Sequence, residues 1–234
     1  MPPQAILFDL DGTLLPLEFN DFVSGYFAAL EKYFWGVFPD GGLAKMITAS
    51  TQEMLQNDGT KSNSDAFWFD FVKLTGRPRE ELEPMFEEFY RKDFAGLCPE
   101  GLVYFPEASQ VVAAVRDKGI RTVLATNPLF PRIAIEHRMA WAHLDTGLFD
   151  FITDYENMRF SKPNPAYYRQ ISEELDVPAG DCLMVGNDIG LDLVPARAAG
   201  MMTYLVENDY EVPADDFNAD YTGPLLGIIP VISA

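Results

Sequence analysis

The first apolar run of the chain leads directly into two acids. Residues 5–8 are continuously apolar, and they are followed by Asp9, Leu10, Asp11, Gly12 and Thr13. A short apolar run that ends in a Gly-Thr turn is typical of a buried strand. We therefore expect residues 5–8 to form a strand that carries Asp9 and Asp11 at its carboxyl end, which is where ligands bind in open α/β sheets.

The apolar spacing then changes to that of helices. Apolar side chains recur every three or four positions between residues 18 and 38, and the same pattern predicts helices at 43–55, 65–74 and 79–94. These stretches predict a separate helical domain at residues 16–98, inserted after the first strand. Its aromatic side chains are expected to pack in the core of the insertion, with an apolar substrate pocket as the alternative: Phe22, Tyr26, Phe27, Phe34, Trp35, Phe67, Trp68 and Phe71.

From Phe105 the chain alternates between helical and strand patterns. Helices are predicted at 107–118, 131–141, 165–175 and 192–199, and strands at 120–125, 148–153, 182–185 and 203–206. The apolar run 224–234 is expected to close the core as a strand or a helix. This alternation predicts an α/β fold with a doubly wound parallel, Rossmann-like sheet, formed by residues 1–15 and 99–234, beside the helical cap domain.

Pro163, Asn164 and Asp192 predict the local structure of the later loops. Pro163 disfavours a helical backbone at Lys162, and Asn164 would cap the helix that follows. We therefore expect Lys162 at the edge of a loop, free to point at a ligand. Asp192 is expected to cap the amino end of the helix at 192–199.

Composition narrows the range of partners. The chain has 234 residues, of which 48% are hydrophobic, and its 17 basic and 36 acidic residues give a formal charge of −19. Such a charge disfavours nucleic acids and anionic membranes, and an anionic substrate would need local positive charge such as a divalent cation. Composition does not indicate an oligomeric state.

Cysteine usage and the terminal segments favour the cytoplasm. Cys98 and Cys182 lie far apart without metal-ligand spacing, so we expect reduced thiols in the core. Only Met-Pro-Pro-Gln precedes the first strand, without a cationic or apolar leader. The apolar run at 224–234 is too short to span a bilayer.

Polar side chains follow four predicted strands or loops, and a parallel sheet would bring them to one edge. They are Asp9 with Asp11, Thr126, Lys162, and Asp188 with Asp192. In this order they resemble the motifs of the haloacid dehalogenase superfamily: an Asp-x-Asp-Gly-Thr strand end, a Ser or Thr, a Lys and an acidic pair. The stretch between Asp11 and Thr126 is far longer than that between Thr126 and Lys162, which resembles the class of this family with a helical cap between the first two motifs.

The resemblance implies a role for each residue. Asp9 would be the nucleophile, and Mg²⁺ would be bound by the carboxylates of Asp9 and Asp188 and by the backbone carbonyl of Asp11. The phosphoryl oxygens would contact Thr126, Asn127 and Lys162, while Asp192 would support the metal or the lysine. Asp11 would act as the general acid and base, which a halide leaving group does not need.

The expected function is therefore a Mg²⁺-dependent phosphatase that acts on a small phosphorylated metabolite through an aspartyl phosphate. A phosphomutase of the same fold and a non-catalytic binding or regulatory protein are the alternatives. His137 and His143 lack ligand spacing and are expected to be surface or hydrogen-bonded histidines. Arg132, Arg159 and the acidic pair Asp215 and Asp216 have no assigned role.

Overall fold

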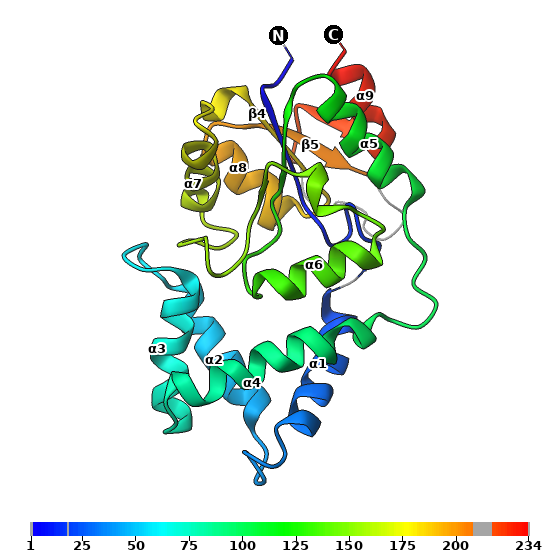
Figure 1. Ribbon diagram of the computed structural model, residues 1–234. Coiled ribbons are helices and arrows are strands. Elements are labelled where there is room, and N and C mark those ends of the chain that lie inside the picture. The colour runs from blue at the N-terminus through cyan, green and yellow to red at the C-terminus, as the bar shows by residue number, and fades with distance from the viewer. Residues whose placement is uncertain (1, 18, 208–216, 234) are drawn as a thin grey trace.

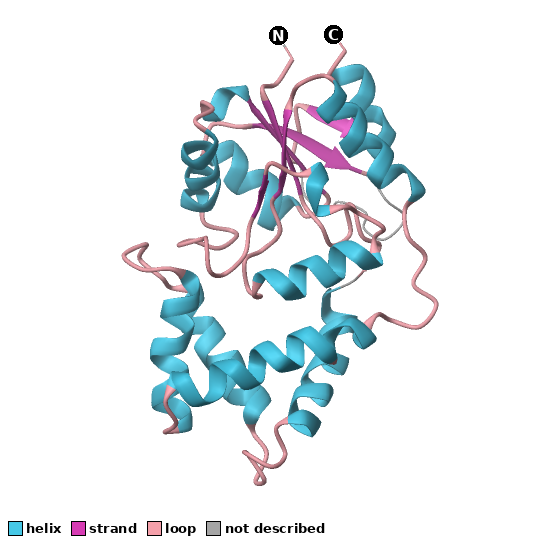
Figure 2. Cartoon of the chain, viewed as in Figure 1, coloured by secondary structure: helices cyan, strands magenta, loops and turns pink. Residues whose placement is uncertain are grey.

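The computed structural model describes residues 2–17, 19–207 and 217–233. Within them, six parallel strands form one sheet in the order β3-β2-β1-β4-β5-β6 (Figure 2). The strands are β1 (Ala5–Phe8), β2 (Arg121–Leu124), β3 (Phe151–Ile152), β4 (Cys182–Gly186), β5 (Met202–Val206) and β6 (Tyr221–Gly223). The strand order reverses beside β1, which confirms the predicted doubly wound α/β fold.

Helices cover both faces of this sheet (Figure 1). Ile6 and Phe8 of β1 pack in one hydrophobic cluster, whereas Ala5 and Leu7 pack in the other. Side chains of a strand alternate between faces, so a strand with two covered faces is apolar at every position. The first cluster includes α5 (Pro106–Asp117), α6 (Arg132–Trp141) and α9 (Ile228–Val231), and the second includes α7 (Pro165–Leu175) and α8 (Val194–Ala198).

The insertion after β1 is helical, as predicted, and forms a second lobe below the sheet in Figure 1. It contains α1 (Phe19–Tyr33), α2 (Leu43–Leu55), α3 (Asn63–Thr75) and α4 (Arg79–Lys92). Of the aromatic side chains expected in its core, seven are buried or partly buried, but Trp35 is 62% exposed. The expectation was wrong for Trp35: α1 ends at Tyr33, and in the turn that follows Phe34 is buried in the core while Trp35 is exposed to solvent. The domain limits 16 and 98 stay a prediction.

Short helical turns account for several differences from the predicted elements. They are η1 (Phe94–Leu97), η2 (Thr146–Leu148), η3 (Ala179–Asp181), η4 (Ile189–Leu193) and η5 (Leu225–Gly227). The end of the chain forms η5 and α9, which is the helical alternative, and β6 was not predicted. The acidic pair Asp215 and Asp216 lies outside the described residues.

The prediction that Asp192 caps a helix was wrong. The cap is Asp188, whose side chain accepts a hydrogen bond from the Leu191 backbone N–H at 2.8 Å. An extra π-helical turn, η4, follows this cap and contains Asp192. The π-helical turn brings Asp192 inward, where it is 1% exposed.

Both cysteines are free thiols, but only Cys182 is buried. The expectation of a core thiol was wrong for Cys98, because this residue follows η1 at the surface of the junction between the insertion and the sheet domain. Within the described ranges no helix is both long and apolar enough to cross a membrane. The cytoplasmic location stays a prediction.

The helical lobe also contacts the sheet domain through the beginning of α3. The backbone N–H groups of Asn63 and Ser64 donate to the carbonyls of Met158 and Tyr155, at 2.8 and 2.7 Å. The Asn63 side-chain amide also donates to the Ser161 hydroxyl at 3.0 Å. Since Ser161 precedes Lys162, the cap domain directly supports the segment that delivers this lysine.

Candidate active site

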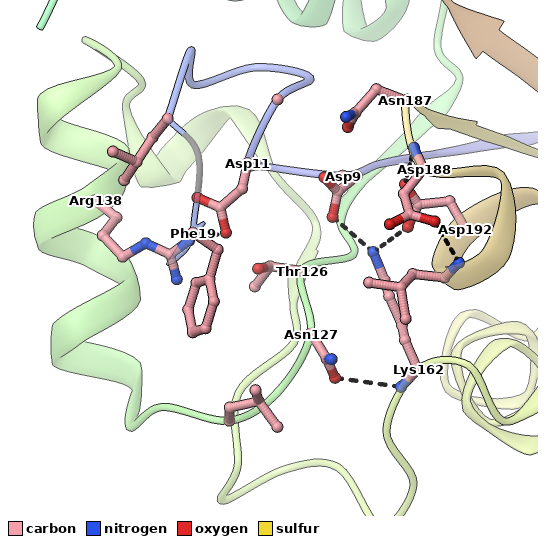
Figure 3. Close-up of a pocket in the computed structure, with 14 residues that line it drawn as sticks. Asp9, Asp11, Phe19, Thr126, Asn127, Arg138, Lys162, Asn187, Asp188 and Asp192 are labelled. Carbon is pink, nitrogen blue, oxygen red and sulfur yellow. Dashed lines mark hydrogen bonds and ion pairs between the residues drawn. The ribbon is translucent and has the colours of Figure 1, made fainter. Parts of the chain in front are cut away.

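The predicted polar residues meet in one cavity at the carboxyl ends of the strands (Figure 3). The cavity has a volume of about 300 Å³. All the residues singled out from the sequence line it: Asp9, Asp11, Thr126, Asn127, Lys162, Asp188 and Asp192. The structure adds residues that the sequence analysis did not assign: Gly12, Leu17, Phe19, Leu129, Arg138, Asn187 and Leu191.

A buried lysine joins two of the aspartates. Lys162 Nζ donates to Asp9 Oδ1 and to Asp192 Oδ1, both at 2.6 Å. Lys162 lies in the loop before α7, as predicted, but it is 3% exposed, so the prediction that its side chain is free was wrong. The reason is electrostatic, because two buried carboxylates need a cation at contact distance.

Burial is the largest influence on the pKa values of Asp9, Asp192 and Lys162. It raises the pKa of Asp9, against the opposing effect of Lys162, and it raises the pKa of Asp192 to about 8, with Asp9 adding to the effect. Burial alone would lower the pKa of Lys162, but Asp192 and Asp9 together raise it well above its usual value. The lysine therefore remains a cation, and the raised pKa values of Asp9 and Asp192 disfavour two full negative charges beside this one lysine.

The loop after β4 depends on a close approach between Gly186 and Asp192. A side chain at Gly186 would overlap the Asp192 carboxylate, so glycine is required at this strand end. The backbone N–H of Asp188 donates to Asp192 Oδ2 at 3.3 Å. The same turn thus orients Asp188 and Asp192 relative to each other.

The loop after β1 is constrained in a similar way by Asn187. Gly12 has a φ of +74°, and a side chain there would overlap Asn187. The hydroxyl of Thr13 donates to Asn187 Oδ1 at 3.0 Å. This bond links the Gly-Thr turn of the first motif to the loop that carries Asp188.

Thr126 and Asn127 follow β2 at the floor of the cavity. The carbonyl of Thr126 accepts hydrogen bonds from the hydroxyls of Thr153 and Tyr167, both at 2.8 Å. Asn127 Oδ1 accepts one from the backbone N–H of Lys162 at 3.2 Å. Thr126 is 2% exposed, and its backbone is fixed with its side chain beside the carboxylates (Figure 3).

Arg138 is the charged residue of the cavity that sequence reasoning missed. It belongs to α6, is 1% exposed, and forms an ion pair with the Asp11 carboxylate. Figure 3 shows Asp11 turned toward Arg138, whereas Asp9 is directed at Lys162. The sequence did contain a signal for Arg138. It lies on the same face of the helix as Ala134 and Ile135, and a charged residue on an otherwise apolar helix face indicates a buried charge with a partner.

The two histidines lie outside the cavity. His143 is exposed and its ring lies 4.2 Å from that of Tyr104, as expected for a surface histidine. The expectation was wrong for His137, since its Nε2 is buried and finds no hydrogen-bond partner within the described parts of the chain. Its ring packs 6.1 Å from that of Phe94.

The charges around the cavity suit a divalent cation. Four aspartates line it, against two basic side chains, Lys162 and Arg138. Carboxylate and carbonyl oxygens are the ligands that Mg²⁺ prefers. No cluster of three or more His, Cys, Asp or Glu side chains suited to a metal occurs among the residues that the structure describes. The expected ligand set has only two carboxylates and one carbonyl, so it stays a prediction.

Fold and cavity together define an α/β protein with a helical insertion after its first strand and an aspartate-lysine cluster at the carboxyl edge of its sheet. A family profile described as haloacid dehalogenase-like hydrolase matches residues 3–200. The chain belongs to this hydrolase family, which confirms the resemblance seen in its motifs.

Curated relatives include two bacterial proteins. One is protein CbbY of Cereibacter sphaeroides, 27% identical over 206 residues, with 85% of this chain and 81% of the relative covered. The other is phosphoglycolate phosphatase of Rhodospirillum rubrum, 27% identical over 215 residues, with 89% and 81% covered.

Similar solved structures share the whole fold at low identity. A 2-haloacid dehalogenase from Pseudomonas syringae has a TM-score of 0.67 at 19% identity, covering 99% of this chain and 98% of its own. The magnesium-bound hydrolase YfnB from Bacillus subtilis has a TM-score of 0.58 at 17% identity and full coverage of both chains. CbbY from Rhodobacter sphaeroides, in complex with xylulose 1,5-bisphosphate, has a TM-score of 0.57 at 20% identity, with 94% and 93% covered. At these identities the likeness concerns the fold.

Proposed function

We propose that this chain is a Mg²⁺-dependent phosphatase that hydrolyses a small phosphorylated metabolite through an aspartyl phosphate on Asp9. The observation that carries the proposal is the buried Asp9 carboxylate, held by Lys162 at a strand end, with Asp11 two residues away in the same cavity. The curated relative named phosphoglycolate phosphatase and the CbbY complex with a sugar bisphosphate support a small phosphate ester as substrate.

In the proposed first step, an Asp9 carboxylate oxygen attacks phosphorus and the bond from phosphorus to the ester oxygen breaks. Asp11 gives a proton to the departing oxygen. In the second step, Asp11 takes a proton from a water molecule, which attacks the phosphorus and releases inorganic phosphate from Asp9. Asp9 and Asp11 thereby return to their starting states.

The other cavity residues would hold the charge that this reaction gathers. Lys162 supplies a fixed positive charge beside Asp9, and Asp192 keeps the lysine in place. The Thr126 hydroxyl and Asn127 would bind phosphoryl oxygens. Asp9, Asp188 and the Asp11 carbonyl would bind Mg²⁺, which would screen the nucleophile from the incoming phosphate. The magnesium-bound neighbour is consistent with this choice of metal.

A phosphate-ester panel tests this function. We expect Mg²⁺-dependent release of phosphate from at least one small monoester without any added sugar bisphosphate. A reaction that requires such an activator would instead indicate a phosphomutase. Absence of turnover over a broad panel would favour a non-catalytic binding or regulatory protein.

A further inference from the structure

Arg138 is a cation in the candidate active site, but the proposed phosphatase reaction gives it no role. It lines the same cavity as Asp9 and Asp11, yet it comes from α6 on a different part of the chain. Its partner among the described acidic side chains is Asp11. That pairing occupies the carboxylate that the proposed reaction needs at the leaving oxygen.

The ion pair is incompletely satisfied on both sides. Arg138 Nε and Asp11 Oδ1 are buried and have no hydrogen-bond partner within the described residues. Buried polar atoms without partners carry a desolvation cost that no hydrogen bond offsets. A ligand that supplied an acceptor to the guanidinium would therefore gain from donors that are already desolvated.

The surroundings of Arg138 prepare it for an anion. Its guanidinium lies 6.0 Å from the Phe19 ring centroid and 5.6 Å from that of Phe130. Aromatic faces hold a guanidinium without using its in-plane N–H donors. Leu17 and Leu129 also line the cavity, and such apolar walls strengthen an ionic contact by excluding water.

Lys162 does not take this role, because its Nζ lies 2.6 Å from Asp9 Oδ1 and so faces the phosphoryl group that Asp9 would attack. Arg138 is the other basic side chain among the described residues that line the cavity. A substrate with two anionic groups would thus meet Lys162 with its phosphoryl group and Arg138 with its second anion.

Resting on the proposed phosphatase function, we propose that Arg138 binds a second anionic group, a carboxylate or a second phosphate, on the leaving part of the substrate. This contact replaces the ion pair between Arg138 and Asp11. With Arg138 bound to the second anion, the Asp11 carboxyl group can hold the proton that the first step delivers to the leaving oxygen, whereas substrates without the second anion leave Asp11 paired with Arg138.

The order of groups across the cavity agrees with this assignment. Asp11 is two residues from Asp9, and its carboxylate contacts Arg138, so it lies between the nucleophile and the arginine (Figure 3). In an ester with a distal anion, the leaving oxygen likewise lies between the phosphorus and that anion. The group that must protonate the oxygen is therefore in the middle position.

Two matched substrate pairs test the proposal. Phosphoglycolate and ethyl phosphate differ by a carboxylate, and 1,3-propanediol bisphosphate and 3-hydroxypropyl phosphate differ by a second phosphate. For at least one pair we expect the wild type to show a roughly 10–100-fold higher kcat/KM for the substrate with the second anion. The same ratio should fall by about this factor in Arg138→Gln and by less in Arg138→Lys, which keeps the charge but not the planar fork.

The ratio of the two kcat/KM values within a pair distinguishes substrate binding by Arg138 from a purely structural role of this residue. A loss of fold or a general loss of turnover lowers both members of a pair and leaves the ratio unchanged. Arg132→Gln is the matched control, because Arg132 lies on the same helix, is 40% exposed and pairs with Glu136. Its ratio should equal that of the wild type.

The outcomes are distinct. If the wild type prefers neither anionic substrate, or if a folded Arg138→Gln variant retains the full preference, the role of Arg138 is overturned while the phosphatase function stands. The wild-type comparison decides this even if Arg138→Gln does not fold. If all four esters resist hydrolysis but the broad panel contains a substrate, only the Arg138 proposal fails. If the whole panel resists, the phosphatase function fails and the Arg138 proposal with it.

Discussion

Asp9 and Asp11 are two residues apart, yet each carboxylate is paired with a cation from a different part of the chain. Lys162 approaches Asp9 from the loop before α7, and Arg138 approaches Asp11 from α6. Separate counter-ions allow neighbouring acids to do different work, because each can change its partner without disturbing the other. In the proposed mechanism, Lys162 holds Asp9 in place for attack, while Asp11 exchanges its partner when substrate binds.

The sequence predicted one of these cations and not the other. Lys162 was found because it stands at a fixed place in a motif series, although its burial was not foreseen. Arg138 belongs to no motif, and its partner lies far away in sequence. The ion pair depends on how α6 packs against the end of β1, and residue spacing does not give that packing.

A pair of buried tyrosines gives a prediction about pH. The hydroxyls of Tyr26 and Tyr90 lie 2.6 Å apart and join α1 to α4. Burial raises the pKa of both groups above the usual value. Unfolded tyrosines ionise near pH 10, so their contribution to stability is complete below about pH 10 and falls as the pH rises further.

We therefore expect the free energy of unfolding to fall less steeply between about pH 9.5 and 11 in the double variant Tyr26→Phe, Tyr90→Phe than in the wild type. Urea unfolding at a series of pH values measures this slope. Replacing both hydroxyls avoids leaving one of them buried without a partner. Equal slopes for the two proteins would show that the tyrosine pair does not carry the alkaline loss of stability.

At the level of elements, the beginning of α3 supports the active-site loop. Asn63 is fully buried, accepts a hydrogen bond from Asn57, and donates to the Phe160 carbonyl and the Ser161 hydroxyl. These contacts fix the segment before Lys162. The cap domain thus contributes to the position of the lysine without reaching the cavity at this point.

Asn63→Ala should lower the free energy of unfolding by about 1–3 kcal/mol, since buried partners lose their hydrogen bonds. It should also lower kcat/KM for the substrate found in the panel, because the loop that carries Lys162 becomes less constrained. Urea unfolding and steady-state kinetics measure the two effects.

Ser62→Ala is the matched control for this variant. The Ser62 hydroxyl caps the same helix by accepting from the Asp65 backbone N–H at 3.0 Å. Its loss should cost about 1 kcal/mol of stability but leave kcat/KM unchanged. Similar kinetic losses in both variants would mean that the stability of α3, rather than the contact with the loop, determines activity.

The elements differ in how well the sequence predicted them. The continuous apolar pattern of β1 identified it because the strand is covered on both faces. β6 has only three residues, two of them exposed at the edge of the sheet, so its pattern is too weak to find. The π-helical turn η4 was missed because Asp192 with Pro195 three residues later also fits an ordinary helix start.

For the molecule as a whole, the position of the site follows from where the carboxyl edge of the sheet meets the helical lobe. The strands are parallel, so their carboxyl ends lie at a single edge, and the insertion after β1 puts the helical lobe at that edge (Figure 1). This arrangement could be predicted from the order of the elements. The lining of the cavity by Phe19, Leu129 and Arg138 could not, because it depends on the angle at which the lobe and α6 meet the sheet.

The proposed mechanism requires that Asp9 forms the bond to phosphorus. Mg²⁺-dependent phosphate release by the wild type and by Asp9→Asn, with the panel's best substrate, tests this requirement. The amide is nearly isosteric but is a very poor nucleophile, so we expect a folded variant with no turnover above background. Hydrolysis at a rate near that of the wild type would exclude Asp9 as the nucleophile.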